Sequence, residues 1–187
     1  TSADVKAETD ICCTSANAVK IIESLNVDKV IFLPDEYLAK YVASKTHVKI
    51  ISWKGKCEVH ERFTDNEIIE LRKKYPNLKV VSHPECPPEV IKASDYTGST
   101  GSMINYVKNT NAKDIFLVTE CSMSDNIQIE NPNINFVKPC NLCPHMKKIT
   151  LQGILKSLIN ENNYVEIDKK IIQRARGAIE RMIAVGR

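Results

Sequence analysis

The sequence predicts an α/β fold made of a repeated unit, followed by a pair of C-terminal helices. Three observations lead to this prediction. Short apolar runs alternate with segments whose apolar residues recur every three or four positions, which is typical of parallel sheets covered by helices. A set of landmarks recurs 84 to 86 residues later in the same order, and the two copies end at Cys57 and Cys143. After Cys143 no further strand pattern follows.

The first copy reads as alternating helices and short strands. Ser15 is a suitable N-cap for a helix, because its hydroxyl can accept a hydrogen bond from a backbone N–H of the first turn. The apolar run 30–33 ends at a proline and predicts a buried strand. A helix over 37–42 and a second strand over 48–53 complete this copy.

The second copy repeats this order after a connecting segment. Thr64 and Glu67 form a capping box that begins a helix, and a strand over 78–81 follows it. Further elements are expected at 87–91 (helix), 102–108 (helix), 115–118 (strand), 134–137 (strand), and, as amphipathic helices, 151–159 and 171–183. The repeat predicts three parts: a first repeat domain over 1–58, a second over 59–143, and C-terminal helices over 144–187.

Composition excludes several classes of protein. A charged fraction of 26% with 43% apolar residues argues against disorder, and no apolar run is long enough to span a membrane. The net charge of +3 is mild and spread along the chain, which disfavours a nucleic-acid partner. Seven cysteines without a signal sequence favour a reducing compartment, so we expect a cytoplasmic protein. The first residue is not methionine and starts within the repeat pattern, which predicts a fragment.

Polar residues gather where the predicted strands end. In parallel sheets, ligands bind beyond the carboxyl ends of the strands and at helix N-termini. The polar residues at such positions are Ser15, His83, Glu85, Ser99 and Thr100, together with the two repeat cysteines. We therefore expect one functional edge.

The repeat cysteines predict a metal site. By count, Cys57, His60, Cys140 and Cys143 would make a Cys3His zinc site. Only Cys57 and Cys143 are equivalent in the repeat, however, and a third equivalent thiolate would then come from a third copy, which suits an iron–sulfur cluster with one open iron. A third interpretation is that these are ordinary buried thiols. The remaining cysteines are interpreted as core or incidental residues: Cys12, Cys13, Cys86 and Cys121.

Two short motifs carry candidate acid–base and anion-binding groups. In His83-Pro84-Glu85, the histidine and the carboxylate point to the same side of an extended backbone, so both could reach one substrate. Alternatively, the motif is a turn with a solvated acid. The segment from Gly98 to Ser102 offers hydroxyls and backbone N–H groups at a helix start, where carboxylate or phosphate binds well, although simple N-capping would also explain it.

Taken together, these motifs resemble the quinolinate synthase family along essentially the whole chain. The resemblance rests on Asp10-Ile-Cys-Cys-Thr-Ser-Ala-Asn-Ala, Trp53-Lys-Gly-Lys-Cys-Glu-Val-His-Glu, Val81-Ser-His-Pro-Glu-Cys, Asp95-Tyr-Thr-Gly-Ser-Thr-Gly and Cys143-Pro-His-Met-Lys. It implies three related three-layer αβα domains in pseudo-threefold symmetry around a central 4Fe-4S cluster. It also implies a transferase that condenses iminosuccinate with dihydroxyacetone phosphate to quinolinate, in the de novo pathway to NAD.

The resemblance also assigns residues. Cys57 and Cys143 match cluster ligands, and the third ligand would lie in a missing N-terminal domain, on which the C-terminal helices would pack. The residues matching substrate-binding positions are Ser15, His83, Pro84, Glu85, Ser99 and Thr100, with Glu85 and His83 as candidate catalytic groups. The fragment alone is expected to be inactive. Two alternatives stay open: a zinc-binding structural or regulatory module, and a non-catalytic domain that holds a small anion.

Overall fold

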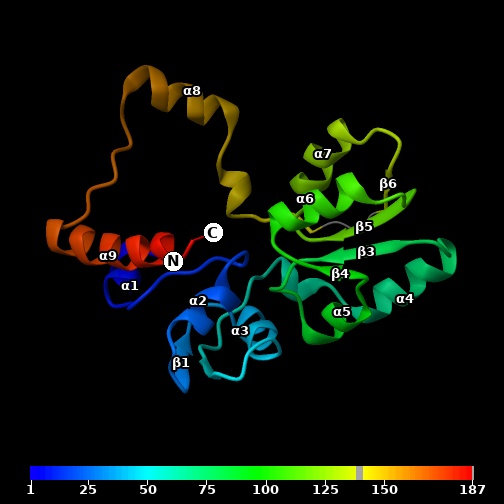
Figure 1. The fold of residues 1–187 in the computed structure, drawn as a ribbon. Coiled ribbons are helices and arrows are strands. Elements are labelled where there is room, and N and C mark those ends of the chain that lie inside the picture. Colours follow the sequence, from blue (N-terminus) through cyan, green and yellow to red (C-terminus); the bar gives the residue numbers. More distant parts are fainter. Residues whose placement is uncertain (138–140, 187) are drawn as a thin grey trace. The chain divides into compact units, whose positions relative to one another are not determined.

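The computed structural model describes residues 1–137 and 141–186, and these residues form two compact units. The first, here called the sheet unit, comprises Thr14–Asn141. The second, here called the helical unit, joins Thr1–Cys13 to Leu142–Gly186. Figure 1 shows the strands confined to the sheet unit. The boundaries of these units differ from those of the sequence repeat, because both repeat copies contribute to the sheet unit.

The first half of the sheet unit holds a two-stranded parallel sheet. Strands β1 and β2 pair in the register Lys29↔Lys49. Helix α3 connects them, and its first turn is capped by Asp35, whose carboxylate accepts a hydrogen bond from the Leu38 N–H. The elements of this half are α2 (Ala18–Ser24), β1 (Lys29–Phe32), α3 (Glu36–Ala43), β2 (Lys49–Ser52) and the 3₁₀ helix η1 (His60–Arg62).

The second half holds a four-stranded parallel sheet in the order β4-β3-β5-β6. The apolar runs of β3 and β5 are buried almost throughout, as expected for central strands with helices on both faces. The elements of this half are α4 (Asp65–Lys74), β3 (Lys79–Ser82), α5 (Pro88–Ala93), β4 (Tyr96–Thr97), α6 (Thr100–Asn109), β5 (Asp114–Val118), α7 (Cys121–Glu130) and β6 (Asn135–Phe136).

Alternate residues of β5 face opposite helical layers. Ile115 and Leu117 pack with Met103 of α6 and Ile127 of α7 in one hydrophobic cluster. Phe116 faces the other way and meets Phe63, which precedes α4, at a ring-centroid distance of 5.9 Å. This period of two places helices on both sides of the sheet, and Figure 1 shows α6 and α7 apart from α4 and α5.

The two copies of the repeat share individual backbone contacts. An isolated parallel bridge joins Asp35 to Gly55, and another joins Glu120 to Asn141 at the equivalent positions of the second copy. The equivalence continues beyond the cysteines. A 3₁₀ helix follows each of them, and a threonine-capped helix of ten residues follows each 3₁₀ helix: α4 in the first copy and α8 in the second.

The helical unit is held together by two helices. Helices α1 (Ala3–Ala7) and α9 (Lys169–Val185) bury Ala7, Ala175 and Ala178. An ion pair of 2.8 Å between Arg174 and Glu8 joins them at the surface. The unit also contains η2 (Met146–Lys148) and α8 (Leu151–Asn160), and α8 has no buried residue.

Several sequence-based expectations need correction. Helix α2 begins at Ala18 with Asn17 as its N-cap, so Ser15 does not cap it. The hydroxyl of Ser15 is used elsewhere, as described below. The strand expected over 134–137 is limited to Asn135–Phe136, and β4 was not expected. Within the ranges that the structure describes, none of the helices combines the length and the apolar character needed to cross a membrane.

Candidate functional site

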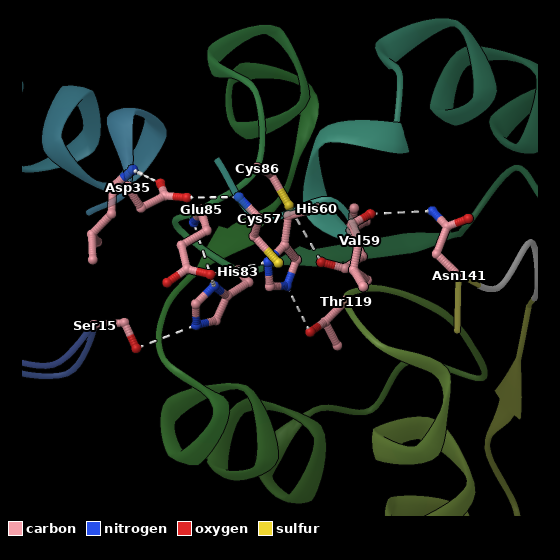
Figure 2. Close-up of polar contacts among 12 residues, drawn as sticks. Ser15, Asp35, Cys57, Val59, His60, His83, Glu85, Cys86, Thr119 and Asn141 are labelled. Carbon is pink, nitrogen blue, oxygen red and sulfur yellow. Dashed lines mark hydrogen bonds and ion pairs between the residues drawn. The ribbon is translucent and has the colours of Figure 1, made fainter. Parts of the chain in front are cut away.

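The candidate site lies where β3 and β5 end, inside the sheet unit. The two strands pair in parallel up to Ser82 and Val118, so the residues that follow them emerge side by side. The His83 N–H donates to the Val118 carbonyl at 3.3 Å and extends this pairing by one step. His83-Pro84-Glu85 and Thr119 thus reach the same edge (Figure 2). This is the edge at which ligands bind in parallel sheets.

His60 connects the ends of both strands. It begins η1, three residues after Cys57, and is buried. Its Nδ1 lies 3.2 Å from Glu85 Oε2, and its Nε2 lies 3.0 Å from Thr119 Oγ1. Its ring is stacked on that of His83, with 4.6 Å between centroids and 12° between planes. Figure 2 shows the imidazole between the carboxylate and the hydroxyl.

His83 faces Ser15, 68 residues earlier in the chain. The distance from His83 Nε2 to Ser15 Oγ is 3.2 Å. The Glu85 N–H donates to His83 Nδ1 at 3.4 Å, so Nδ1 acts as an acceptor and Nε2 is the nitrogen that carries hydrogen towards Ser15. The structure therefore brings three of the sequence-predicted residues, Ser15, His83 and Glu85, to one place.

A buried carboxylate anchors the Cys57 loop. The Cys57 N–H donates to Asp35 Oδ2 at 3.0 Å, and the Leu38 N–H donates to Asp35 Oδ1 at 2.7 Å. Burial raises the pKa of Asp35 despite these two N–H donors. Asp35 thereby links the start of α3 to the loop that presents the cysteine. The sequence analysis missed this residue, although its place directly after the strand-ending Pro34 was a signal for an N-cap.

The environment favours ionised forms of Cys57 and His60. Burial alone raises the pKa of the Cys57 thiol, but hydrogen bonds from the His60 side chain and from the backbone N–H groups of His60 and Val59 outweigh it and leave the pKa below its usual value. Burial lowers the pKa of His60, yet Cys57 and Glu85 raise it to about 9. Together these shifts make the Cys57 thiol easier to ionise and keep the His60 imidazole protonated at neutral pH.

The surroundings shift the pKa values of Glu85 and His83 so that one side chain is charged and the other is neutral at pH 7. Burial raises the pKa of Glu85, but the hydrogen bond from His60 and the charge of His60 bring it below the ordinary value, so the group is a carboxylate at neutral pH. Burial and the charge of His60 lower the pKa of His83 to about 4, which keeps this imidazole neutral. A carboxylate and a neutral histidine, each within reach of a shared ligand, can take and hold protons.

Three metal-ligating groups converge here. Ligand atoms of Cys57, His60 and Glu85 all lie within 4.8 Å of one another. Sulfur, imidazole nitrogen and carboxylate oxygen in this arrangement suit a transition metal. The site therefore has the chemistry to hold a metal and to move protons beside it.

The other predicted site residues are placed differently. Ser99 is the N-cap of α6 and accepts a hydrogen bond from the Ser102 N–H, while Thr100 is exposed in the first turn. Pro84 is buried between the two polar residues of its motif. Cys143 lies half-buried before η2 in the helical unit, and Cys140 lies outside the described residues.

The remaining cysteines follow the interpretation as core residues in part. Cys86 is fully buried and its thiol donates to the Val118 carbonyl at 3.4 Å, while burial raises its pKa. Burial, with the charge of Cys12, raises the pKa of Cys13 to about 11. Cys121 is buried but disulfide-bonded, which the sequence analysis did not expect.

Two site residues escaped the sequence analysis: Asp35 and Thr119. A third, His60, was considered only as a zinc ligand. No local motif marks Thr119, because its importance comes from a partner 59 positions earlier.

The fold and the site define a class of protein: an α/β repeat protein with a thiol, imidazole and carboxylate site at the carboxyl edge of a parallel sheet. Residues 1–184 match the family model described as NadA, Quinolinate synthetase A protein. The chain belongs to this family.

Curated relatives agree with the family assignment. Quinolinate synthase 1 of Mesorhizobium japonicum is 55% identical over 185 residues, which cover 99% of this chain and 57% of that protein. Quinolinate synthase of Sinorhizobium fredii is 56% identical over 98% of this chain and 51% of that protein, and that of Xylella fastidiosa (strain Temecula1) is 53% identical over 99% and 55%. The chain spans about half the length of the curated relatives it matches.

Proposed function

We propose that this chain forms part of a quinolinate synthase that condenses iminosuccinate with dihydroxyacetone phosphate to quinolinate, for de novo NAD synthesis in the cytoplasm. The family assignment supports this proposal. The observation that carries it is the meeting of Ser15, His60, His83 and Glu85 beside Cys57 at one sheet edge. The relatives are named as synthases, and the reaction would make this protein a transferase.

In the sheet unit, the proposed cluster ligand is Cys57, and its surroundings fit an iron–sulfur cofactor. Cys57 is half-buried, and its lowered pKa favours the thiolate that binds iron. We propose Cys57 and Cys143 as two of three thiolate ligands of a 4Fe-4S cluster, with the third supplied from outside this chain. When bound, an open iron would supply a Lewis acid that polarises a substrate oxygen.

The chain's own residues would handle protons and anionic groups. Ring closure requires protons to leave carbon and nitrogen, and the Glu85 carboxylate is ionised and held by His60 for that task. Neutral His83 carries hydrogen on Nε2 and, with the Ser15 hydroxyl, would donate hydrogen bonds to a substrate carboxylate or phosphate. Ser99 and Thr100, at the start of α6, would bind a second anionic group, and Pro84, which matches a substrate-binding position, lies buried in the turn between His83 and Glu85.

The test uses a chimera in which this chain replaces the matching 57% of the Mesorhizobium japonicum protein. We expect the chimera, assembled with iron and sulfide under anaerobic conditions, to form quinolinate, and the chain alone to form none. Glu85→Gln should reduce kcat by about 10²–10⁴-fold with iron content unchanged. Cys57→Ser should lose the cluster. Cys86→Ser is the matched control and should retain it, because the buried Cys86 thiol is hydrogen-bonded to the Val118 carbonyl.

Two results would contradict the proposal. A chimera that binds iron but forms no quinolinate would show that the site does not support this reaction. Near-normal turnover of Glu85→Gln, or loss of its iron, would show that the carboxylate is structural or a ligand.

The convergence of Cys57, His60 and Glu85 supports a second candidate, a zinc-binding structural or regulatory module. This ligand set differs from the Cys3His set that the sequence offered as an alternative, because Glu85 lies beside Cys57 and His60. Protein purified without added metal separates the two: stoichiometric zinc without iron favours the zinc module, and a brown, oxygen-sensitive sample favours the cluster. An anion-binding domain without catalysis would leave the chimera inactive.

A further inference from the structure

We propose that His60 and Thr119 are positioning residues that aim the Glu85 carboxylate, through one continuous hydrogen-bonded chain from Thr119 to His60 to Glu85. This inference rests on the proposed function, in which Glu85 moves protons. It adds two residues that never need to touch the substrate.

The three residues come from three separate segments. Thr119 directly follows β5, His60 begins η1, and Glu85 lies three residues past the end of β3. The two links are 3.0 Å, from Thr119 Oγ1 to His60 Nε2, and 3.2 Å, from His60 Nδ1 to Glu85 Oε2. Both ring nitrogens are therefore occupied, so the imidazole cannot rotate without breaking both contacts.

The imidazole is also held from its face and its backbone. The stacked ring of His83 covers one face at 4.6 Å. Directly before His60, the Val59 carbonyl accepts a hydrogen bond from Asn141 Nδ2 at 3.4 Å, and Val59 itself is buried. The ring thus has a fixed position against the end of β5. Its Nδ1 is a fixed point to which the more mobile carboxylate is tied.

Of the three hydrogen-bonded residues, Glu85 is the one whose side chain has to be held in place by another residue. Its side chain has three rotatable bonds and is partly exposed, whereas the side chains of His60 and Thr119 are buried. Without the link to His60, the carboxylate would sample several rotamers. Catalysis by a general base depends on the base lying within hydrogen-bond reach of the proton it removes. A misplaced carboxylate therefore lowers kcat more than it weakens substrate binding.

A hydroxyl at position 119 suits this role in either charge state of the ring. If both nitrogens carry hydrogen, Nε2–H donates to Thr119 Oγ1 while Nδ1–H donates to Glu85. If only Nδ1 carries hydrogen, the Thr119 O–H donates to Nε2 and keeps Nδ1–H directed at the carboxylate. Valine has the same shape but offers neither a donor nor an acceptor.

The first test measures quinolinate formation by the chimera. Thr119→Val should lower kcat by about 10–10²-fold with KM within about twofold. The reason is that the Glu85 carboxylate would no longer be held in position, while the groups that bind substrate are unchanged. Thr119→Ser should recover most of the activity. Thr97→Val is the matched control: the Thr97 hydroxyl is paired with Ser82 Oγ at 2.8 Å near the same sheet edge, outside the proposed chain, so this variant should keep kcat near the unsubstituted value.

A double-mutant cycle distinguishes positioning from a structural role. In a Glu85→Gln background, Thr119→Val should cause little further loss of kcat, since its effect passes through the carboxylate that is already removed. Additive losses, a Thr119→Ser variant as slow as Thr119→Val, or an equal loss in Thr97→Val would overturn the inference.

A structural test on the chain itself needs no turnover, so failure of the inference can be told from failure of the proposed function. Crystal structures of the chain and of Thr119→Val should show an ordered Glu85 carboxylate on His60 Nδ1 in the first and a displaced or multiply placed carboxylate in the second. An unchanged His60–Glu85 contact in Thr119→Val would overturn the inference whether or not the chimera makes quinolinate.

Discussion

Helices α4 and α8 occupy equivalent positions in the two repeats but have opposite surroundings. Each has ten residues, each begins after a threonine N-cap, and each follows a cysteine and a 3₁₀ helix. Before α4, Phe63 is 2% exposed, and within it Ile68 is 1% exposed. Their equivalents around α8, Ile149 and Ile154, are 71% and 47% exposed.

The difference lies in what each helix meets. Helix α4 packs beside α5, and its Arg72 reaches the Leu78 and Ala93 carbonyls and the Asp95 carboxylate around β3. The position equivalent to Arg72 in α8 is Leu158, which is 71% exposed. An amphipathic helix gains most of its stability from packing of its apolar face. Among the described residues, α8 therefore presents a face that is suited to a partner it does not contact.

The repeat indicates the kind of partner. Helix α5 packs against α4, and Phe63 ahead of α4 packs on Phe116 of β5, so the repeat predicts a similar α/β segment over α8. The C-terminal helices were expected to pack on a further repeat domain, and that expectation stays a proposal. The predictions below test whether the two helices differ only in their partners.

The largest effect is expected from a matched pair of truncations. Phe63→Ala removes a buried ring that packs on Phe116, and should lower the free energy of unfolding of the chain by about 3–5 kcal/mol. Ile149→Ala, at the equivalent exposed position, should change it by less than about 0.5 kcal/mol. Urea unfolding followed by circular dichroism measures both. Similar losses in the two variants would refute the comparison.

A charge on α8 should matter only once its partner is present. In the chain alone, Ile154→Lys should leave the free energy of unfolding within about 0.5 kcal/mol, because the side chain is half in solvent. In the chimera with the remainder of the Mesorhizobium japonicum protein, the same variant should cost about 2 kcal/mol or more, since the charge would be buried. Hydrogen exchange of α8 amides, slower in the chimera, provides an independent readout. Equal exchange in both proteins would show that α8 stays uncovered.

The smallest effect concerns the anchor that α4 has and α8 lacks. Burial raises the pKa of Asp95, but the Val80 N–H, Arg72 and Lys79 bring it below the ordinary value. A carboxyl whose folded-state pKa is depressed stabilises the fold above its unfolded pKa, and this contribution is lost as pH falls through the folded pKa. Because solvent screens the exposed Asp95 carboxylate, Asp95→Asn should cost at most about 1 kcal/mol at pH 7 and progressively less below about pH 4. A cost independent of pH would mean that the hydrogen bonds matter without the charge.

Much of the fold followed from local patterns. The apolar runs of β3 and β5 were recognisable because buried parallel strands need continuous Val, Ile and Leu, and the capping box of Thr64 marked the start of α4. The run at β1 was also recognised as a strand, but it is not buried as expected, since Ile31 is 74% exposed in a two-stranded sheet. The N-cap at Ser15 was assigned wrongly, since a serine near a helix start cannot reveal that its hydroxyl is bound to a histidine 68 residues away.

The candidate site divides in the same way. The sequence by itself indicated that His83 and Glu85 act together, but the expected extended backbone was wrong, because Pro84 and Glu85 lie in a turn closed by the Cys86 N–H, which donates to the His83 carbonyl at 3.0 Å. The equivalence of Cys57 and Cys143 followed from the repeat. Only the tertiary structure decided that His60 is hydrogen-bonded to both Glu85 and Thr119, and that Asp35 holds the Cys57 loop. It also decided that α4 is covered while α8 is exposed. The physical reason is that hydrogen bonds and burial between distant segments depend on strand pairing and helix packing, which no local spacing of residues records.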